Sequence, residues 1–580
     1  MSKIKCIIDG NEVAFDEQIS ILEACRSIGI RVPTLCHMKL DGTPYENKPS
    51  SCRICVVEVK GRRNLVTACS EKIVNGMIIN TNTYRAIHAR KINLELLLSN
   101  HPKDCLVCPK NLNCELQKLA DELGVRTIDY QGERMAHSVD YKSHAIVRDP
   151  SKCIMCRRCE MMCNKVQEVG VLSARHRGFE TTVTPAFNLP LKDSSCTFCG
   201  QCVAVCPTGA IVEVDETQKV WAALRDPNQH VVVQVAPAIR VAIGELFGME
   251  PGKISTGKLV TALKTMGFDT VFDTDFGADL TVMEEASELV HRIKNNGRMP
   301  MLTSCCPAWV RFIEENFPDL LDVPSTCKSP QMMTGAMVKS YYAKKKGINP
   351  ENITMVSIMP CTAKKEEIKR DELKNDGMQN VDIVMSTREL GRLIHMFSID
   401  FQDLPDSEFD TLLGESTGAA VIFGTTGGVI EAAVRTAYEW LTGKELKKVE
   451  FTELRGFENI RSATVKIGDM DLKIGIAHGL GNSKRLLQGI QSGEFDFDVI
   501  EIMACPGGCI GGGGQPYHHG DMSILSNRRQ ALYEIDKNKK IRKAHENPEI
   551  KQIYKDFLGD IYGEKAHRYL HTGYVKREKI

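Results

Sequence analysis

The sequence has 580 residues, with 74 lysines and arginines, 74 aspartates and glutamates, and therefore a formal net charge of zero. This length predicts several domains, and the balanced charge argues against a nucleic-acid-binding protein, which usually carries a basic excess. The first residues form no apolar signal region, and no apolar run is long enough to span a bilayer. A cytoplasmic protein without a membrane span is therefore expected.

Cysteine is the most informative residue type in this chain. There are 23 cysteines, and 17 of them precede residue 210, mostly in short CxxC groups. Because structural disulfides are rare in a reducing compartment, metal ligation explains these residues better. Iron-bound thiolates in such number would be vulnerable to oxygen, so an anaerobic setting is also expected.

Residues 1–82 combine alternating apolar positions with a short helical pattern and predict a small mixed domain. Four of its cysteines have the spacing C-x15-C-x2-C-x13-C. A close pair with distant partners is typical of plant-type [2Fe–2S] ferredoxins, although the loop spacing differs; zinc is the alternative, but zinc sites favour two close pairs. The predicted cluster ligands are Cys36, Cys52, Cys55 and Cys69, whereas Cys6 and Cys25 are expected to be buried core thiols.

Residues 83–140 are predicted to be helical around the segment HPKDCLVCPKNLNC. One histidine and three cysteines stand there: His101, Cys105, Cys108 and Cys114. This ligand set serves structural zinc as well as [4Fe–4S] clusters, and the spacing alone does not separate the two. The neighbouring cluster motifs favour [4Fe–4S], and an imidazole in place of a thiolate would raise its reduction potential.

Residues 141–215 contain one cysteine pattern twice. CIMCRRCEMMC and CTFCGQCVAVCP both have the spacing C-x2-C-x2-C-x3-C. In two-cluster bacterial ferredoxins the fourth cysteine of each run binds the other cluster. One [4Fe–4S] cluster is therefore assigned to Cys153, Cys156, Cys159 and Cys206, and a second to Cys163, Cys196, Cys199 and Cys202.

Residues 216–516 alternate apolar strands with amphipathic helices, which predicts a parallel α/β core covered on both faces. The run AAVIFGTTGG at residues 419–428 is expected to be one of the strands. Two glycine segments, at residues 424–429 and 478–484, lie between a strand and a helix. Neither is a complete nucleotide-binding motif, so tight turns are favoured over phosphate loops.

Three further cysteine elements stand in this region: TSCCPAW (303–309), MPCTAKK (359–365) and EIMACPGGCIGGGGQP (501–516). One cysteine from each of the first two plus Cys505 and Cys509 would make four thiolates, the number a [4Fe–4S] cluster takes. The glycines let the backbone approach such a group closely. Residues 517–580 are polar and helical, and we expect an apolar stripe there to dock on the main domain: Ile550, Ile553, Tyr554, Phe557 and Leu558.

Together these motifs resemble the [FeFe]-hydrogenases, over nearly the whole chain. The resemblance implies a multidomain fold of α+β and α/β type: ferredoxin-like β-grasp and bacterial two-cluster ferredoxin modules, then an α/β catalytic domain and a C-terminal segment like the family's small subunit. It implies one [2Fe–2S] cluster, three accessory [4Fe–4S] clusters and an H-cluster. The H-cluster is a [4Fe–4S] cube joined to a two-iron azadithiolate unit with CO and CN ligands. The implied activity is reversible H2 oxidation and proton reduction.

Carried over position by position, the resemblance assigns the cube ligands to Cys306, Cys361, Cys505 and Cys509. It assigns the pocket around the two-iron unit to Ala236, Pro237, Gln331, Met359, Lys364 and Met503. It implies a proton path through Cys305, Glu285, Ser325 and Glu288. From spacing alone the two glutamates would be an exposed acidic face of one helix. Cys327 matches no family role and is expected in the core.

Three positions depart from the monomeric clostridial enzymes: Ala308, Pro506 and Ala238. This set is similar to the catalytic subunits of NAD-linked, electron-bifurcating hydrogenases, some of which carry a further C-terminal cysteine cluster that is missing here. Expected partners are therefore ferredoxin and iron–sulfur subunits that bind flavin and NAD. The alternatives are a stand-alone ferredoxin-dependent hydrogenase and a subunit that exchanges electrons with a formate dehydrogenase.

Overall fold

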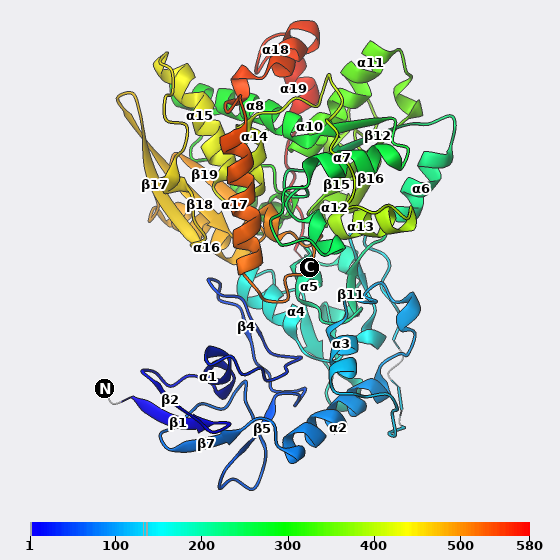
Figure 1. Ribbon diagram of the computed structural model, residues 1–580. Coiled ribbons are helices and arrows are strands. Elements are labelled where there is room, and N and C mark those ends of the chain that lie inside the picture. Colours follow the sequence, from blue (N-terminus) through cyan, green and yellow to red (C-terminus); the bar gives the residue numbers. More distant parts are fainter. Residues whose placement is uncertain (1–2, 132, 135–136, 580) are drawn as a thin grey trace.

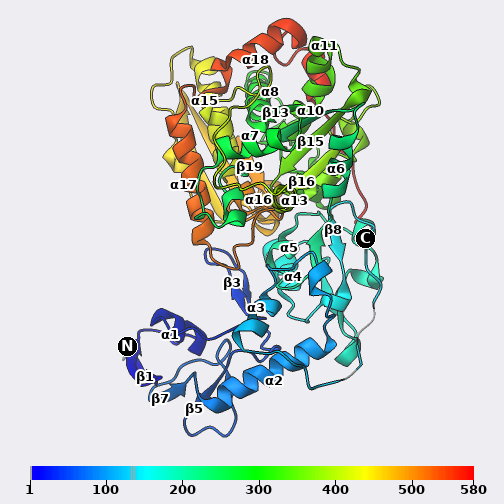
Figure 2. The ribbon, with the colours of Figure 1, turned by 45° about the vertical axis from the view of Figure 1, so that its right-hand side comes forward.

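The computed structural model describes residues 3–131, 133–134 and 137–579. In Figure 1 the N-terminal domain lies at one end, the catalytic domain at the other, and the two-cluster module between them. Figure 2 shows the same order after rotation, with the N-terminal sheet far from the catalytic core. No helix in the described ranges is long and apolar enough to cross a membrane.

The N-terminal domain is built on a five-stranded sheet in the order β2-β1-β7-β5-β6. The first strand is antiparallel to its hairpin partner and parallel to β7, so the chain crosses over through α1 in between. Cys6 (3% exposed) and Cys25 (0%) are in its core, as predicted. The bounds are β1 (Ile4–Ile8), β2 (Asn11–Phe15), α1 (Ile21–Ser27), β5 (Val56–Val59), β6 (Val66–Thr67) and β7 (Met77–Asn80).

Short helices and strands carry the cysteine groups that follow the N-terminal domain. One arginine, Arg158 of the two-cluster module, contacts both modules that precede it. Arg158, only 2% exposed, forms an ion pair of 2.7 Å with Glu115 and donates a hydrogen bond of 3.2 Å to the carbonyl of His37. A buried arginine satisfied by partners from two other modules holds their relative positions. The elements are α2 (Tyr84–Asn100), α3 (Glu115–Glu122), β8 (Ile146–Arg148), α4 (Arg158–Met161), α5 (Gln201–Val205) and β11 (Ile211–Glu213).

Two four-stranded sheets form the centre of the catalytic domain, in the orders β13-β12-β15-β16 and β14-β19-β18-β17. All pairs in the first sheet are parallel, whereas β17 and β18 form an antiparallel hairpin at the edge of the second. The strands are β12 (His230–Val235), β13 (Thr270–Asp273), β14 (Met301–Leu302), β15 (Ile353–Met359), β16 (Ile383–Ser386), β17 (Ile460–Ile467), β18 (Met470–His478) and β19 (Val499–Met503).

Helices cover both sheets, as the apolar strands require. Those that matter for the site are α8 (Thr274–Lys294), α9 (Pro307–Asn316), α10 (Pro330–Met337), α12 (Ala363–Glu367), α13 (Thr387–Met396), α15 (Gly428–Thr442) and α16 (Leu480–Ser492).

Two predictions about this domain were wrong. The expected strand at residues 419–428 is helical, with α14 (Gly418–Val421) followed by a 3-10 turn at Ile422–Gly424. This segment is buried on all sides, and a short apolar run does not distinguish a buried strand from a buried helix. The sheet is also not purely parallel, because the strand β17, which the pattern did not predict, pairs antiparallel with β18.

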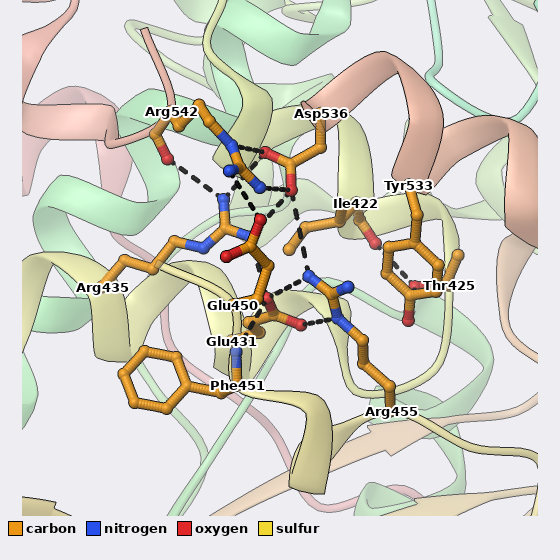
Figure 3. Close-up of polar contacts among 10 residues, drawn as sticks. All are labelled: Ile422, Thr425, Glu431, Arg435, Glu450, Phe451, Arg455, Tyr533, Asp536 and Arg542. Carbon is orange, nitrogen blue, oxygen red and sulfur yellow. Dashed lines mark hydrogen bonds and ion pairs between the residues drawn. The ribbon is translucent and has the colours of Figure 1, made fainter. Parts of the chain in front are cut away.

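The C-terminal helices α17 (Ser523–Asn538), α18 (Pro548–Ile553) and α19 (Glu564–Leu570) dock on the catalytic domain. The predicted apolar stripe does face it, since Ile550 and Ile553 are fully buried in the main core. Figure 3 shows a charged network that ties α17 to α15. In it, Arg435 pairs with Glu431 at 2.8 Å and with Asp536 at 2.9 Å, and none of the three is more than 1% exposed.

Candidate active site and cluster sites

The three cysteine elements of the catalytic domain meet at one cavity. They follow the carboxyl ends of β14, β15 and β19, and the loop after β12 adds a fourth side. Ligands in α/β proteins bind at such strand ends because the loops there converge. Every predicted cube ligand and pocket residue lines the cavity: Ala236, Pro237, Cys306, Gln331, Met359, Cys361, Lys364, Met503, Cys505 and Cys509.

The donor set fits an iron–sulfur group. Burial raises the pKa of Cys505, and the thiols of Cys361 and Cys306 raise it further. Thiols crowded in this way ionise only when bound cations neutralise them, and all of them are free cysteines. The loop that carries Cys505 and Cys509 needs glycine to pack on the protein: a Cβ at Gly508 would lie 2.7 Å from the backbone nitrogen of Thr426, and φ there is +96°.

A buried cation stands at the cavity. Lys364 Nζ lies 2.9 Å from Glu367 Oε2 and donates to the carbonyl of Cys305 at 3.1 Å. Burial lowers the pKa of Lys364, but the Glu367 carboxylate outweighs it, and the net shift is upward. Gln331 Nε2 also donates to Glu367, at 2.9 Å. The Oε1 atom of Gln331 is buried and has no hydrogen-bond partner in the described chain.

Glu367 is a site residue that sequence reasoning missed. It also accepts a hydrogen bond from Ser329 at 3.0 Å and is 5% exposed. The motif AKKEE holds two adjacent glutamates, and only Glu367 lies three residues after Lys364 on α12, the spacing that brings two side chains together. That helical spacing was the available signal.

The residues of the predicted proton path lie near one another beside the cavity. Glu285 and Glu288 are each 1% exposed, so they are not an exposed acidic face of α8. Burial, and after it the Glu288 carboxylate, raises the pKa of Glu285 to about 8. Ser325 Oγ donates to Glu288 Oε2 at 2.9 Å. Burial raises the pKa of Cys305, and the Glu285 carboxylate adds to this shift.

Glu288 leads from this buried row toward the surface. Arg292, one turn further along α8, pairs with its Oε1 at 2.6 Å and has an 11% exposed side chain. Glu285 Oε1, by contrast, has no hydrogen-bond partner among the described residues. A protonatable carboxyl with an unpartnered oxygen at one end and a charged, partly exposed pair at the other suits proton transfer.

In the two-cluster module, the thiols gather in crossed sets. Burial raises the pKa of Cys153 to about 11, and Cys206 of the second run adds to the shift. Burial likewise raises the pKa of Cys199 to about 12, with a contribution from Cys163 of the first run. Each fourth cysteine thus lies with the other run. This is the arrangement that the repeated motif predicts for two clusters.

The two N-terminal cluster sets lie close to this module. Asn47 Nδ2 donates to the carbonyl of Cys36 at 2.7 Å and to that of Cys156 at 2.9 Å, which joins the first set to the third. A Cβ at Gly209 would lie 2.6 Å from Cys108 Sγ, so the second set abuts the module as well. His101 Nδ1 is buried without a hydrogen-bond partner in the part of the chain that the structure describes, which suits a metal-ligating nitrogen.

The loop of the two-cluster module around Gly200 contacts the glycine-rich loop around Gly513, which follows the cavity cysteines, through backbone atoms of both. A Cβ at Gly513 would lie 2.6 Å from the Cα of Gly200, and Thr362 Oγ1 donates to the carbonyl of Phe198 at 2.7 Å. The Cys199 thiol consequently contributes to the raised pKa of Cys505. Only glycine permits such an approach. The thiol sets therefore form a row from the N-terminal domain to the cavity.

At both glycine segments that resembled phosphate loops, side chains of the protein itself accept hydrogen bonds from the N-terminus of the following helix. At the start of α15, the backbone N–H of Gly427 donates to Glu501 Oε1 at 2.5 Å, and that of Ile430 donates to Oε2 at 3.0 Å. At the start of α16, Gln167 of the two-cluster module accepts a hydrogen bond of 3.2 Å from Leu480. A carboxylate already occupies the first helix N-terminus, where a phosphate would bind.

A row of thiol sets that ends at a thiol cavity lined by Lys364 is the arrangement of a multi-cluster iron–sulfur oxidoreductase. Five family descriptions match the chain in order. They are a 2Fe-2S iron-sulfur cluster binding domain (residues 1–84), the NADH-ubiquinone oxidoreductase-G iron-sulfur binding region (90–129), a 4Fe-4S dicluster domain (152–210), the C-terminal domain of the iron-only hydrogenase large subunit (229–513) and the iron hydrogenase small subunit (522–577).

Full-length relatives agree. The chain is 54% identical over its whole length to the NADP-reducing hydrogenase subunit HndD of Solidesulfovibrio fructosivorans, whose length is also wholly covered. It is 39% identical to iron hydrogenase 1 of Clostridium pasteurianum, over 98% of this chain and 99% of that one. A solved [FeFe]-hydrogenase structure, HydA(deltaEFG), matches with a TM-score of 0.57 and 44% identity over 63% of this chain and 99% of its own.

The chain therefore belongs to the [FeFe]-hydrogenase family and is an iron hydrogenase, an oxidoreductase that carries iron–sulfur clusters and an H-cluster. The predicted family and the predicted fold class, with ferredoxin modules ahead of the catalytic domain, are confirmed.

Proposed function

We propose that this chain is the catalytic subunit of an NAD(P)-linked, electron-bifurcating hydrogenase complex. In it, electrons from H2 pass to NAD(P)⁺ and to ferredoxin through partner subunits that bind flavin. The main support is the 54% identity, end to end, with a subunit of a hydrogenase named as NADP-reducing. Both glycine loops are filled by the chain's own side chains, so the nicotinamide nucleotide is assigned to a partner.

Within this chain, each predicted site residue keeps the role that the resemblance gave it. When bound, the H-cluster supplies the redox chemistry of H2 ⇌ 2H⁺ + 2e⁻. Lys364 supplies positive charge at the cavity wall, and the two methionines supply adaptable apolar packing. Cys305 Sγ carries a proton between the cavity and Glu285, and Ser325 Oγ passes it to Glu288. The accessory thiol sets hold one [2Fe–2S] and three [4Fe–4S] clusters.

The proton path is tested with Glu285→Gln, which keeps the shape of the side chain and removes its titrating proton. The rate of H2 evolution should fall by about 100-fold or more, the contribution usual for a positioned acid–base group. The matched control is Glu315→Gln. Glu315 is also buried and its pKa is also raised by burial, but it pairs with Arg311 on α9, away from the path. Equal rates in both variants would refute the path.

The complex is tested on protein isolated anaerobically from its native host, with its co-purifying chains identified. H2-driven NAD(P)⁺ reduction that requires oxidised ferredoxin, with a flavoprotein present, is the expected result. H2-driven ferredoxin reduction by the lone chain, without NAD(P)⁺ activity, would instead identify a stand-alone hydrogenase. A co-purifying formate dehydrogenase would favour the third alternative.

A further inference from the structure

Three side chains of different chemistry meet beside Glu285 at a place to which the proposed function assigns no ligand. Glu288, Cys327 and His571 each offer one ligand atom, and these atoms all lie within 4.8 Å of one another. All three residues are buried. They come from α8, from the loop before α10 and from the residue after α19, and a β-bridge pairs the second with the third. Carboxylate, thiolate and imidazole together are ligands typical of zinc.

The surroundings of His571 are those of a metal-binding histidine. Its Nε2 lies 2.9 Å from Glu284 Oε2, and the backbone N–H of Tyr562 and the hydroxyl of Tyr554 donate to that same carboxylate. Ligating histidines usually hold their second nitrogen on a carboxylate, which sets the orientation of the ring. The other nitrogen, Nδ1, faces Thr326 Oγ1 at 2.7 Å.

That hydroxyl bridges two of the three residues, because Thr326 Oγ1 also donates to Glu288 Oε2 at 3.2 Å. A cation bound there would take over these contacts, with water or the hydroxyl completing four-coordination. Glu288 and the thiolate of Cys327 supply two negative charges to a divalent cation, and Arg292 pairs with the other oxygen of Glu288 at 2.6 Å. Binding releases the thiol proton to solvent, so the step is M²⁺ + R–SH → R–S–M⁺ + H⁺.

The group lies one layer below the surface. Tyr562, which is partly exposed, meets the His571 ring edge-on at 5.4 Å between centroids. His567, which is exposed, stacks on the same ring at 4.3 Å. The buried His571 ring is therefore covered by two side chains that themselves reach solvent.

We propose that Glu288, Cys327 and His571 bind a divalent cation of the zinc type, and that the bound cation blocks proton transfer through Glu288. The blocking effect rests on the proton path proposed above, whereas the binding does not. Glu288 Oε2 accepts hydrogen bonds from Ser325 and Thr326, so a cation on this carboxylate removes the acceptor that receives the proton.

The test uses the full-length chain with its iron–sulfur clusters loaded, so that the cluster thiols are occupied, and zinc as the probe. Zinc-edge X-ray absorption should report one zinc per chain, with one sulfur at about 2.3 Å and nitrogen or oxygen at about 2.0 Å. Cys327→Ser should lose the sulfur shell. Cys6→Ser is the matched control, since Cys6 is an equally buried thiol in the N-terminal domain, and it should keep the shell.

Zinc should also inhibit H2 evolution by the wild type and by Cys6→Ser, but not by Cys327→Ser. If Cys327→Ser folds poorly, His571→Gln is the second variant, and its zinc affinity should be at least tenfold lower than that of the wild type. Circular dichroism checks that this variant is folded. A zinc shell without sulfur, or one unchanged in Cys327→Ser, overturns the site. Zinc bound through sulfur with no loss of H2 evolution overturns the blocking role. If zinc binds as expected while Glu285→Gln is fully active, the proton path fails and the metal site stands.

Discussion

Glu367→Gln tests whether one buried carboxylate sets the charge of Lys364. The substitution keeps the size of the side chain and an oxygen that can accept from Ser329 and Gln331, but it removes the negative charge. Lys364 then stays buried, with a 12% exposed side chain, and has lost its counter-ion. Burial alone lowers the pKa of a lysine, because the charged form is poorly solvated.

The ion-pair distance gives the magnitude. With Nζ and Oε2 at 2.9 Å and an effective dielectric constant of about 20, unit charges attract by about 6 kcal/mol. The Glu367 carboxylate holds the pKa of Lys364 above its ordinary value against the effect of burial, so its loss leaves burial unopposed by this carboxylate and should lower the pKa of the lysine. The lysine is charged below this pKa and neutral above it.

The assay is the rate of H2 evolution with an artificial electron donor between about pH 6 and 9. If a charged Lys364 is required, the ratio of variant to wild-type rate should fall as the pH rises through the lowered pKa of Lys364, by about tenfold for each further pH unit. Glu372→Gln is the control, because that carboxylate pairs with Arg577 at 3.3 Å. A variant profile parallel to that of the wild type would refute the reasoning.

Two further predictions concern stability. Arg435→Met removes one guanidinium from the network of Figure 3 and leaves Glu431 paired with Arg455 and Asp536 paired with Arg542. The loss of its charged hydrogen bonds should cost about 1–3 kcal/mol, seen as a lower denaturation midpoint, whereas Arg568→Met on the exposed surface should change the stability by less than about 1 kcal/mol. Although burial raises the pKa of Glu213, the Arg388 guanidinium holds it well below the ordinary 4.5, so its stabilisation is present above pH 4.5 and lost as the pH falls below it. The midpoint difference between wild type and Glu213→Gln should therefore shrink at acid pH, and a constant difference would contradict this.

Local patterns carried much of the fold prediction. Strands such as β12 and β15 were readable because each is a short apolar run with β-branched residues that ends at a turn marked by proline. The helix α14 could not be predicted, because every residue of Gly418–Val421 is apolar and buried. The segment therefore has no hydrophobic periodicity that would distinguish a helix from a strand. The edge strand β17 was missed although its exposed residues stand at the alternate positions 462, 464 and 466, which is the pattern of a half-buried strand.

The candidate site divides in the same way. Cys305 and Lys364 stood in motifs that could be recognised, and both line or adjoin the cavity. Glu367 and Cys327 stood outside these motifs. Lys364 is a local partner of Glu367, but its other partners, Ser329 and Gln331, come from another part of the fold, as do the neighbours of Cys327. Cys327 was expected as a core residue and is buried in the main core, but only the structure places it within 4.8 Å of ligand atoms of Glu288 and His571.

By itself, the sequence determined the identity of the cluster modules and of the family, because ligands only a few residues apart are brought together by the chain's own geometry whatever surrounds them. Only the tertiary structure decided which distant groups meet: the backbone contact of Gly200 with Gly513, the carboxylate of Glu501 in a loop that resembled a phosphate site, and His571 beside the proton path. Such contacts join residues tens to hundreds of positions apart. They depend on how sheets and modules pack, which no local spacing encodes.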